Sequence, residues 1–182
     1  LLIALARHIP QATASMKGGK WEKNAFTGME LSNRTLGVIG LGNIGRIVAD
    51  RARGLGMCVI AYDPYTSAEL AAKVDVELVS LDELFRTSDI ISCHAPLTND
   101  TRHVVNRARL ANMKPSAILI NTSRGEVVDE TALYEALRVG GGLSTQPHLA
   151  PRLNAFVRPD QVLAVVKGVS EIFRDSDVLR QN

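Results

Sequence analysis

The sequence predicts a doubly wound parallel α/β sheet in three layers, with helices covering both faces. Three observations carry this prediction. A short apolar run at residues 36–39 is followed by three glycines at G-x-G-x-x-G spacing. The next apolar run ends in an acidic residue, Asp63, about 20 positions beyond the glycines. Strand-like and helix-like segments then alternate along the chain, which is typical of parallel sheets.

The three glycines each meet one need of a strand–turn–helix unit that binds a dinucleotide. Gly40 permits a tight turn, Gly42 lets a pyrophosphate approach the backbone, and Gly45 lets the helix pack closely on the strand. The free N–H groups at the start of that helix face the phosphates, where the helix dipole favours negative charge. Because glycine turns also join strands to helices for structural reasons alone, the motif needs a second signal.

Asp63 is that second signal. It closes the apolar run at residues 57–62 and is followed by Pro64. A carboxylate at this place accepts hydrogen bonds from the adenosine ribose and repels a 2′-phosphate, so NAD is favoured over NADP. The alternative is that Asp63 only forms a turn before the proline. In combination with the glycines, it predicts a Rossmann-like NAD site.

Five strands and the helices between them follow from the apolar pattern. The strands are expected at residues 36–39, 57–62, 76–79, 89–93 and 117–121. Ser67, Ser80 and Asp129 are suited to begin helices, because short polar side chains cap free N–H groups. Helices are therefore expected at 1–9 (interrupted by Pro10), 12–17, after the glycine turn, and at 67–73, 81–87, 106–113 and 130–139, the last ended by glycines 140–142.

The candidate site residues all follow strands. Beyond the glycines and Asp63, one group begins at His94 and another at Thr122, each just after a predicted strand. Because ligands of parallel sheets bind at the carboxyl ends of the strands, these loops are expected to line one crevice.

Composition bounds the remaining possibilities. Apolar residues make up 46% of the 182 residues and aromatic residues only 4%, which predicts an aliphatic, alanine-rich core. A net charge of +2 argues against binding to nucleic acid or to a membrane surface. No apolar run approaches the roughly 20 residues of a membrane span. Residues 1–142 are expected to form the NAD-binding domain, and 143–182 a divergent segment with one helix starting near Pro159.

The two cysteines, Cys58 and Cys93, each lie in an apparently buried strand. Neither has the Cys/His spacing of a metal site, so no metal is predicted. Inert core thiols in a reducing compartment are expected, which indicates the cytoplasm.

Motifs in the first 139 residues resemble, in order, those of the D-isomer-specific 2-hydroxyacid dehydrogenases, and most closely the phosphoglycerate dehydrogenases among them. These enzymes exchange hydride between NAD and a 2-hydroxy or 2-keto acid. The matching stretches lie at residues 5–10, 18–21, 37–45, 62–64, 94–98, 113–115, 121–125 and 128–130.

The resemblance implies roles for individual residues. Asn43 and Ile44 would lie at the pyrophosphate, and Asp63 at the ribose. Position 43 is often Arg in the family, so Asn43 implies weaker cofactor binding. Two loops complete the NAD site: Ala95 and Pro96 on the adenine side, and Thr122, Ser123 and Arg124 on the nicotinamide side.

Arg124 matches the arginine that binds the substrate's carboxylate, for which a guanidinium fork is suited. The alternative is a surface arginine in a loop. His148 is the one match for the catalytic histidine, and its alternative is a loop histidine left by rearrangement. His94 is expected near the cofactor, and His8 and His103 at the surface.

The glutamate that supports the catalytic histidine in the family has no counterpart here. The chain is therefore expected to be an NAD-dependent oxidoreductase domain that is incomplete for turnover. The alternative is an NAD-binding and dimerisation module or a fragment of a longer enzyme. The apolar opening at residues 1–9 and Trp21 lie outside the strand–helix pattern. By resemblance they imply a homodimer.

Overall fold

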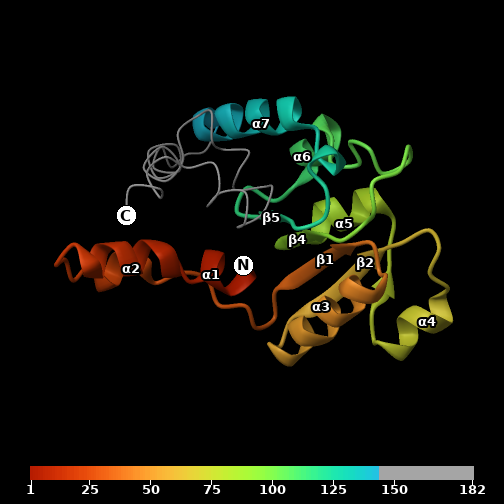
Figure 1. Cartoon of the computed structure of the whole chain (residues 1–182), viewed down its shortest axis with the longest axis horizontal. Helices are drawn as coiled ribbons and strands as arrows, with labels where there is room; N and C mark the ends of the chain where they lie inside the picture. Colours follow the sequence, from red (N-terminus) through yellow and green to blue (C-terminus); the bar gives the residue numbers. More distant parts are fainter. Residues whose placement is uncertain (144–182) are drawn as a thin grey trace.

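The computed structural model describes residues 1–143, which form a five-stranded, all-parallel sheet flanked by helices (Figure 1). The strand order is β3-β2-β1-β4-β5, so the chain builds outward from β1 and then returns to its other side. The doubly wound fold predicted from the sequence is confirmed. The strands are β1 (Thr35–Ile39), β2 (Cys58–Tyr62), β3 (Glu77–Leu78), β4 (Ile90–Cys93) and β5 (Ile118–Asn121).

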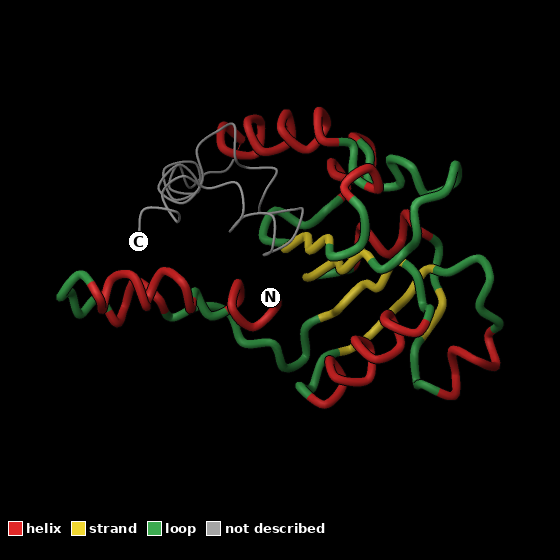
Figure 2. The backbone as a smooth tube through the Cα atoms, viewed as in Figure 1, coloured by secondary structure: helices red, strands yellow, loops and turns green. Residues whose placement is uncertain are grey.

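The helices between the strands begin where the sequence predicts (Figure 2). Ser67 Oγ accepts a hydrogen bond from Leu70 N–H, and Asp129 Oδ1 accepts one from Ala132 N–H. The described helices are α1 (Leu2–Ala6), α2 (Ile9–Lys17), α3 (Asn43–Gly54), α4 (Ala68–Lys73), α5 (Leu81–Thr87), α6 (Arg107–Asn112) and α7 (Glu130–Leu143), with 3₁₀ turns η1 (Lys23–Phe26) and η2 (Gly125–Val127).

Two hydrophobic clusters cover the two faces of the sheet. Successive side chains of a strand point to opposite faces. Leu36 and Val38 of β1 accordingly pack in one cluster with Ala49 and Ala52 of α3. Ile39 of β1 belongs to the other cluster, which includes Leu84, Phe85, Ile91 and Cys93. The core is aliphatic and rich in alanine, as the composition predicts.

Helix α3 lies very close to β1. Its buried residues are Gly45, Ala49 and Ala52, whereas Ile44 is 61% exposed and Ile47 is also exposed. The apolar period thus predicts the helix correctly but does not mark its buried face. Because α3 packs so closely on β1, only glycine and alanine fit on the helix face that meets the strand.

Three sequence predictions are wrong in detail. The first concerns Pro10, which does not interrupt a helix. The break comes earlier, at His8, whose φ is 51°, and Pro10 lies in the first turn of α2. A proline is well suited to this place, because the first N–H groups of a helix have no intrahelical partner.

The second concerns Cys58, which is exposed at the first position of β2, while Cys93 is buried as predicted. Burial raises the pKa of the Cys93 thiol to about 12. The third concerns α7, which continues through glycines 140–142 to Leu143. Glycine lowers helix stability by about 1 kcal/mol per residue but does not forbid the helical conformation. The predicted helix near Pro159 lies outside the described residues.

The first two helices form an arm beside the sheet. Ala6 of α1 is buried, and its carbonyl accepts a hydrogen bond from Met29 N–H at 2.7 Å. Helix α2 contributes no buried residue and projects away from the sheet (Figures 1 and 2). Within residues 1–143, no helix has the length and apolar character needed to cross a membrane.

Asp89 ties the amino ends of the central strands together. Its carboxylate accepts hydrogen bonds from Thr35 N–H and Lys114 Nζ, each at 2.9 Å, and lies 3.8 Å from Arg34. Burial alone raises the pKa of Asp89. The hydrogen bonds from Thr35 and Lys114 and the charges of Lys114 and Arg34 together outweigh burial, so the pKa lies below its usual value.

Asp89→Asn is therefore expected to lower the free energy of unfolding at pH 7 by about 1.5–3 kcal/mol, the worth of hydrogen bonds to a charged group. A carboxylate with a lowered folded-state pKa stabilises above its unfolded pKa, about 3.9, and less as pH falls through the folded value. The difference between the two proteins should shrink below about pH 4 in urea denaturation. Asp50→Asn, at an exposed site on α3, is the control. An equal difference at pH 7 and pH 3 would refute this role.

Candidate functional site

The candidate residues lie together at the carboxyl edge of the sheet. The glycine turn follows β1, Asp63 follows β2, His94 follows β4, and Thr122 follows β5. Between β1 and β4 the winding of the sheet reverses. Ligands of such sheets bind outside the strand ends at this reversal.

The three glycines of the turn have different neighbours. A Cβ on Gly40, whose φ is +92°, would lie 2.7 Å from Ala95 N, and one on Gly45 would lie 2.0 Å from Gly40 O. A Cβ on Gly42 would meet no heavy atom within 4 Å. The fold itself thus requires Gly40 and Gly45, whereas Gly42 keeps open space beside the helix start. This is the space that a pyrophosphate needs to reach the backbone.

The amino end of α3 is prepared for an anion. Gly42 precedes the helix without a side-chain cap, and the first turn has no acidic residue. Arg46 Nη2 donates to Asn43 Oδ1 at 2.8 Å, so a guanidinium lies beside that turn. Arg46 thus supplies near this turn a positive charge that Asn43 lacks. Because a cation at the positive end of a helix dipole is unfavourable by itself, an anion bound there would be stabilised by both.

Asp63 connects the end of β2 to the glycine turn. Its Oδ2 accepts from Leu41 N–H at 2.7 Å, and its Oδ1 accepts from Tyr65 N–H at 2.8 Å. The bond from Tyr65 is the local turn contact expected if Asp63 only forms a turn before Pro64. The bond from Leu41 is an additional contact, to the glycine turn after β1. A carboxylate has about four lone-pair sites, so two remain for ribose hydroxyls.

His94 is held by its own strand, β4, and by the neighbouring strand β1. Its ring Nε2 lies 2.8 Å from Ser92 Oγ of β4, and its backbone N–H donates to Ile39 O of β1 at 2.7 Å. Burial lowers the pKa of His94, which favours the neutral ring at pH 7. A neutral ring does not suit a cationic proton donor, and the place of His94 near the cofactor stays a prediction. Ala95 is buried against the glycine turn, and Pro96 is exposed.

The buried side chain of Asn121 shapes the loop that carries Arg124. Asn121 Nδ2 donates to Arg124 O at 2.8 Å, while its Oδ1 accepts from the N–H and the hydroxyl of Ser123. Asn121 is not among the site residues that the sequence predicts. The feature that could have indicated its role is a side-chain amide at the end of an otherwise apolar strand.

A hollow of about 470 Å³ lies beside Arg124, lined also by Leu97, His103, Glu126 and Asp129 among others. His103 is exposed, as expected, yet it is the one described histidine in this lining. The sequence does not predict that His103 and Arg124 line the same hollow, since they come from two separate loops.

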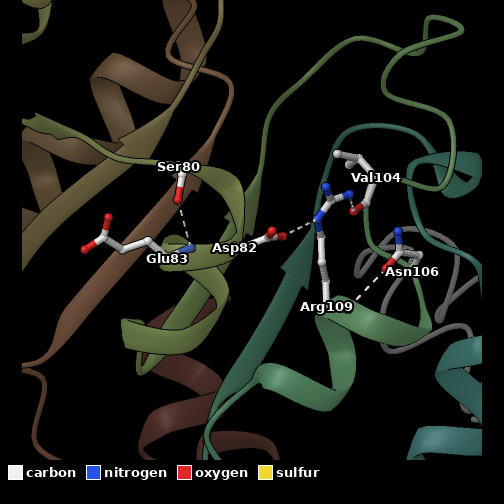
Figure 3. A network of polar contacts seen from close by, with 6 residues as sticks. All are labelled: Ser80, Asp82, Glu83, Val104, Asn106 and Arg109. Carbon is white, nitrogen blue, oxygen red and sulfur yellow. Dashed lines mark hydrogen bonds and ion pairs between the residues drawn. The ribbon is translucent and has the colours of Figure 1, made fainter.

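Hydrogen bonds join the loop after β4 to the loop after β5. His103 N–H donates to Glu126 O at 2.9 Å, and Val105 N–H donates to Val127 O at 3.1 Å. Arg109 of α6 binds the loop after β4 (Figure 3): its Nη1 donates to Val104 O at 2.8 Å. Its Nε donates to Asp82 of α5 at 3.2 Å. The Arg124 loop is thus supported by α5 and α6.

Two further predictions concern the donor and metals. His148 lies outside the described residues, so its place relative to Arg124 stays a prediction. Within residues 1–143, no group of three or more His, Cys, Asp or Glu side chains could hold a metal ion.

Comparison with known proteins identifies relatives of the whole described region. Residues 1–142 match the family model of the D-isomer specific 2-hydroxyacid dehydrogenase NAD binding domain. The chain is 52% identical over 141 residues to a D-3-phosphoglycerate dehydrogenase of Methanocaldococcus jannaschii, and 54% over 140 residues to a hydroxypyruvate reductase of Thermotoga maritima. Each match covers 77% of this chain, but only 27% and 45% of the two relatives.

The apo-structure of D-lactate dehydrogenase from Escherichia coli superimposes with a TM-score of 0.72 and 38% identity. That match covers 76% of this chain and 44% of the solved one. The sheet order, the glycine turn, the aspartate after β2 and these matches agree. The chain belongs to the D-isomer-specific 2-hydroxyacid dehydrogenase family, of which it contains the NAD-binding domain.

Proposed function

We propose that this chain binds NAD(H) at the carboxyl edge of its sheet, with the pyrophosphate over Gly42, Asn43 and Ile44 and the adenosine ribose on Asp63. Ala95 and Pro96 lie on the adenine side, and Thr122, Ser123 and Arg124 on the nicotinamide side. The observation that carries the proposal is the open space at Gly42 beside an uncapped helix start, with Asp63 hydrogen-bonded to the same turn.

We further propose that the protein to which this chain belongs oxidises or reduces a small 2-hydroxy or 2-keto acid, of the phosphoglycerate type. Bound NAD supplies the hydride acceptor. Arg124 orients the substrate, because its guanidinium matches a planar carboxylate and it lines the hollow next to the nicotinamide side. His148 exchanges the hydroxyl proton in this proposal.

A second candidate function is NAD binding and subunit contact without turnover. The hollow at Arg124 favours it for the chain by itself, because His103, Arg124 and Glu126 in the lining of that hollow are exposed to solvent. Both functions keep the NAD site, so a turnover assay separates them.

The cytoplasm is the proposed location, on the ground that Cys58 and Cys93 are free thiols.

The cofactor proposal predicts that the chain prefers NADH to NADPH and that Asp63→Ala binds NADH roughly tenfold more weakly or worse. The reason is the loss of hydrogen bonds to a charged acceptor, worth ~1.5–3 kcal/mol. Calorimetric titration with both cofactors measures this. Asp50→Asn on α3 removes the same charge away from Asp63 and should bind NADH as the unmutated chain does. Equal affinity of the unmutated chain for NADH and NADPH would disprove the ribose role.

The assembly proposal is a homodimer formed through the arm. Leu1, Ile3 and Ile9 are exposed, Met16 is too, and Trp21 is 76% exposed. Exposed apolar side chains along the first 21 residues favour a partner surface. Light scattering should give a dimer mass at micromolar concentration, and Ile9→Glu should give a monomer. Leu70→Glu is the control, since Leu70 on α4 is 45% exposed against 47% for Ile9. A monomeric unmutated chain at 100-fold higher concentration would rule the dimer out.

A further inference from the structure

We propose that Asp63 has a second task beyond the ribose: its carboxylate holds the glycine turn in the shape that receives the pyrophosphate. Asp63 is then a positioning residue for the phosphates. The ligand in this inference comes from the proposed function, whereas the hydrogen bonds that carry it do not depend on any ligand.

The contact lies at the centre of the turn. Leu41 stands between Gly40 and Gly42, its side chain is buried, and its N–H donates to Asp63 Oδ2 at 2.7 Å. The preceding N–H, of Gly40, donates to Tyr62 O at 2.9 Å. Two successive donors of the turn therefore bind the end of β2, the second of them through a side chain.

The carboxylate that accepts this bond cannot rotate freely. Its other oxygen accepts from Tyr65 N–H at 2.8 Å, so both oxygens are held by backbone groups. Gly40 has a φ of +92°, which glycine adopts without strain, so its own conformation does not fix the turn. Asp63 supplies a fixing contact one residue further along, at Leu41 N–H. The backbone of the turn is thereby held at Leu41, directly before the open space at Gly42.

This double use has a consequence for cofactor choice. A small neutral residue at position 63 removes the charge that repels a 2′-phosphate. It also removes the acceptor for Leu41 N–H. We therefore expect such a substitution to lose NADH affinity without an equal gain in NADPH affinity, because both cofactors share the pyrophosphate.

Asp63→Asn is the sharpest variant, because it keeps the size of the side chain and leaves one acceptor oxygen in place of two. The amide NH₂ replaces one carboxylate oxygen and cannot accept, and the oxygen that remains is uncharged. The Leu41 N–H therefore either loses its acceptor or keeps a weaker, neutral one. In the ligand-free protein, amide hydrogen exchange followed by NMR should show Leu41 exchanging roughly tenfold faster, as expected for a lost charged hydrogen bond. Val38 in the middle of β1 should be unchanged, and Asp50→Asn should leave both amides unchanged.

Binding then separates the two tasks of Asp63. ADP and 2′,3′-dideoxy-ADP are titrated into the unmutated chain and into Asp63→Asn. A residue that only reads the ribose would lose affinity for ADP alone. Removing a negative charge near a diphosphate should even strengthen binding of the dideoxy compound. A positioning residue predicts the opposite, a loss of about fivefold or more for the dideoxy compound as well.

The outcomes are decisive in each direction. Faster Leu41 exchange together with weaker dideoxy-ADP binding supports the inference. Unchanged Leu41 exchange, or a loss confined to ADP, overturns it. If the unmutated chain binds neither nucleotide at millimolar concentration, the proposed function fails, and Leu41 exchange alone decides whether Asp63 holds the turn.

Discussion

Gly45→Ala is expected to destabilise the domain by about 3 kcal/mol or more, the upper range for forcing extra volume into a packed site. The added methyl would lie 2.0 Å from the carbonyl oxygen of Gly40 and 3.3 Å from Val38. Backbone on one side and a core strand on the other leave it no room. Helix α3 would have to move off β1, taking Ala49 and Ala52 out of the core. Thermal and urea denaturation measure the loss.

Gly42→Ala is the matched control within the same turn. No heavy atom lies within 4 Å of its added methyl, and its φ of −71° suits any residue. Stability should change by no more than about 1 kcal/mol, the usual worth of a residue at this helix position. NADH affinity should nevertheless fall at least tenfold, since the methyl occupies the space proposed for the pyrophosphate. Equal stability losses in the two variants would contradict the separate roles given to these glycines.

The second large effect concerns turnover. The 182-residue chain is expected to bind NADH yet to reduce 2-keto acids very slowly or not at all. Missing general acid–base help alone costs ~10²–10⁴ in rate. His94 cannot supply it readily, because its ring is paired with Ser92 and burial lowers its pKa. Arg124 without a positioned donor can only bind and polarise the substrate.

NADH oxidation with 3-phosphohydroxypyruvate and other 2-keto acids tests this. Turnover near one per second, abolished by His148→Ala, would show that His148 completes the site. The same rate abolished by His103→Ala would assign the donor to the histidine that lines the Arg124 hollow. Arg124→Gln is the companion variant. It should lower any turnover by more than it weakens NADH binding, if Arg124 orients the substrate as well as lying on the nicotinamide side.

Local signals in the sequence predicted the architecture well. Every strand except β3 (Glu77–Leu78) lies in a mostly apolar run, and the polar residues that cap helices stand where the structure begins them, as at Ser67 and Asp129. The site could be predicted for the same reason. Glycine spacing and an acidic strand end are local, and parallel strands bring their carboxyl ends to one edge.

The remaining features depend on contacts between distant segments. Cys58 reads as a buried strand residue, but it stands at the exposed first position of β2. The buried face of α3 is made of Gly45, Ala49 and Ala52, whereas its isoleucines are exposed, because β1 lies too close for larger side chains. The hydrogen bond between Leu41 and Asp63 joins loops that are separate in the sequence. His103 and Arg124, also from separate loops, line the same hollow.

The central claim is that NADH binds along the carboxyl edge of the sheet, from Asp63 across the glycine turn to Arg124. Titration of the ¹⁵N-labelled chain with NADH, followed by two-dimensional NMR, tests it most directly. The account predicts amide shifts at Leu41, Gly42 and Asn43, at Asp63 and Ala95, and in the loop 122–125. It predicts none at Asp89 and Lys114 on the opposite edge. Shifts centred on that opposite edge, or none at millimolar NADH, would contradict it.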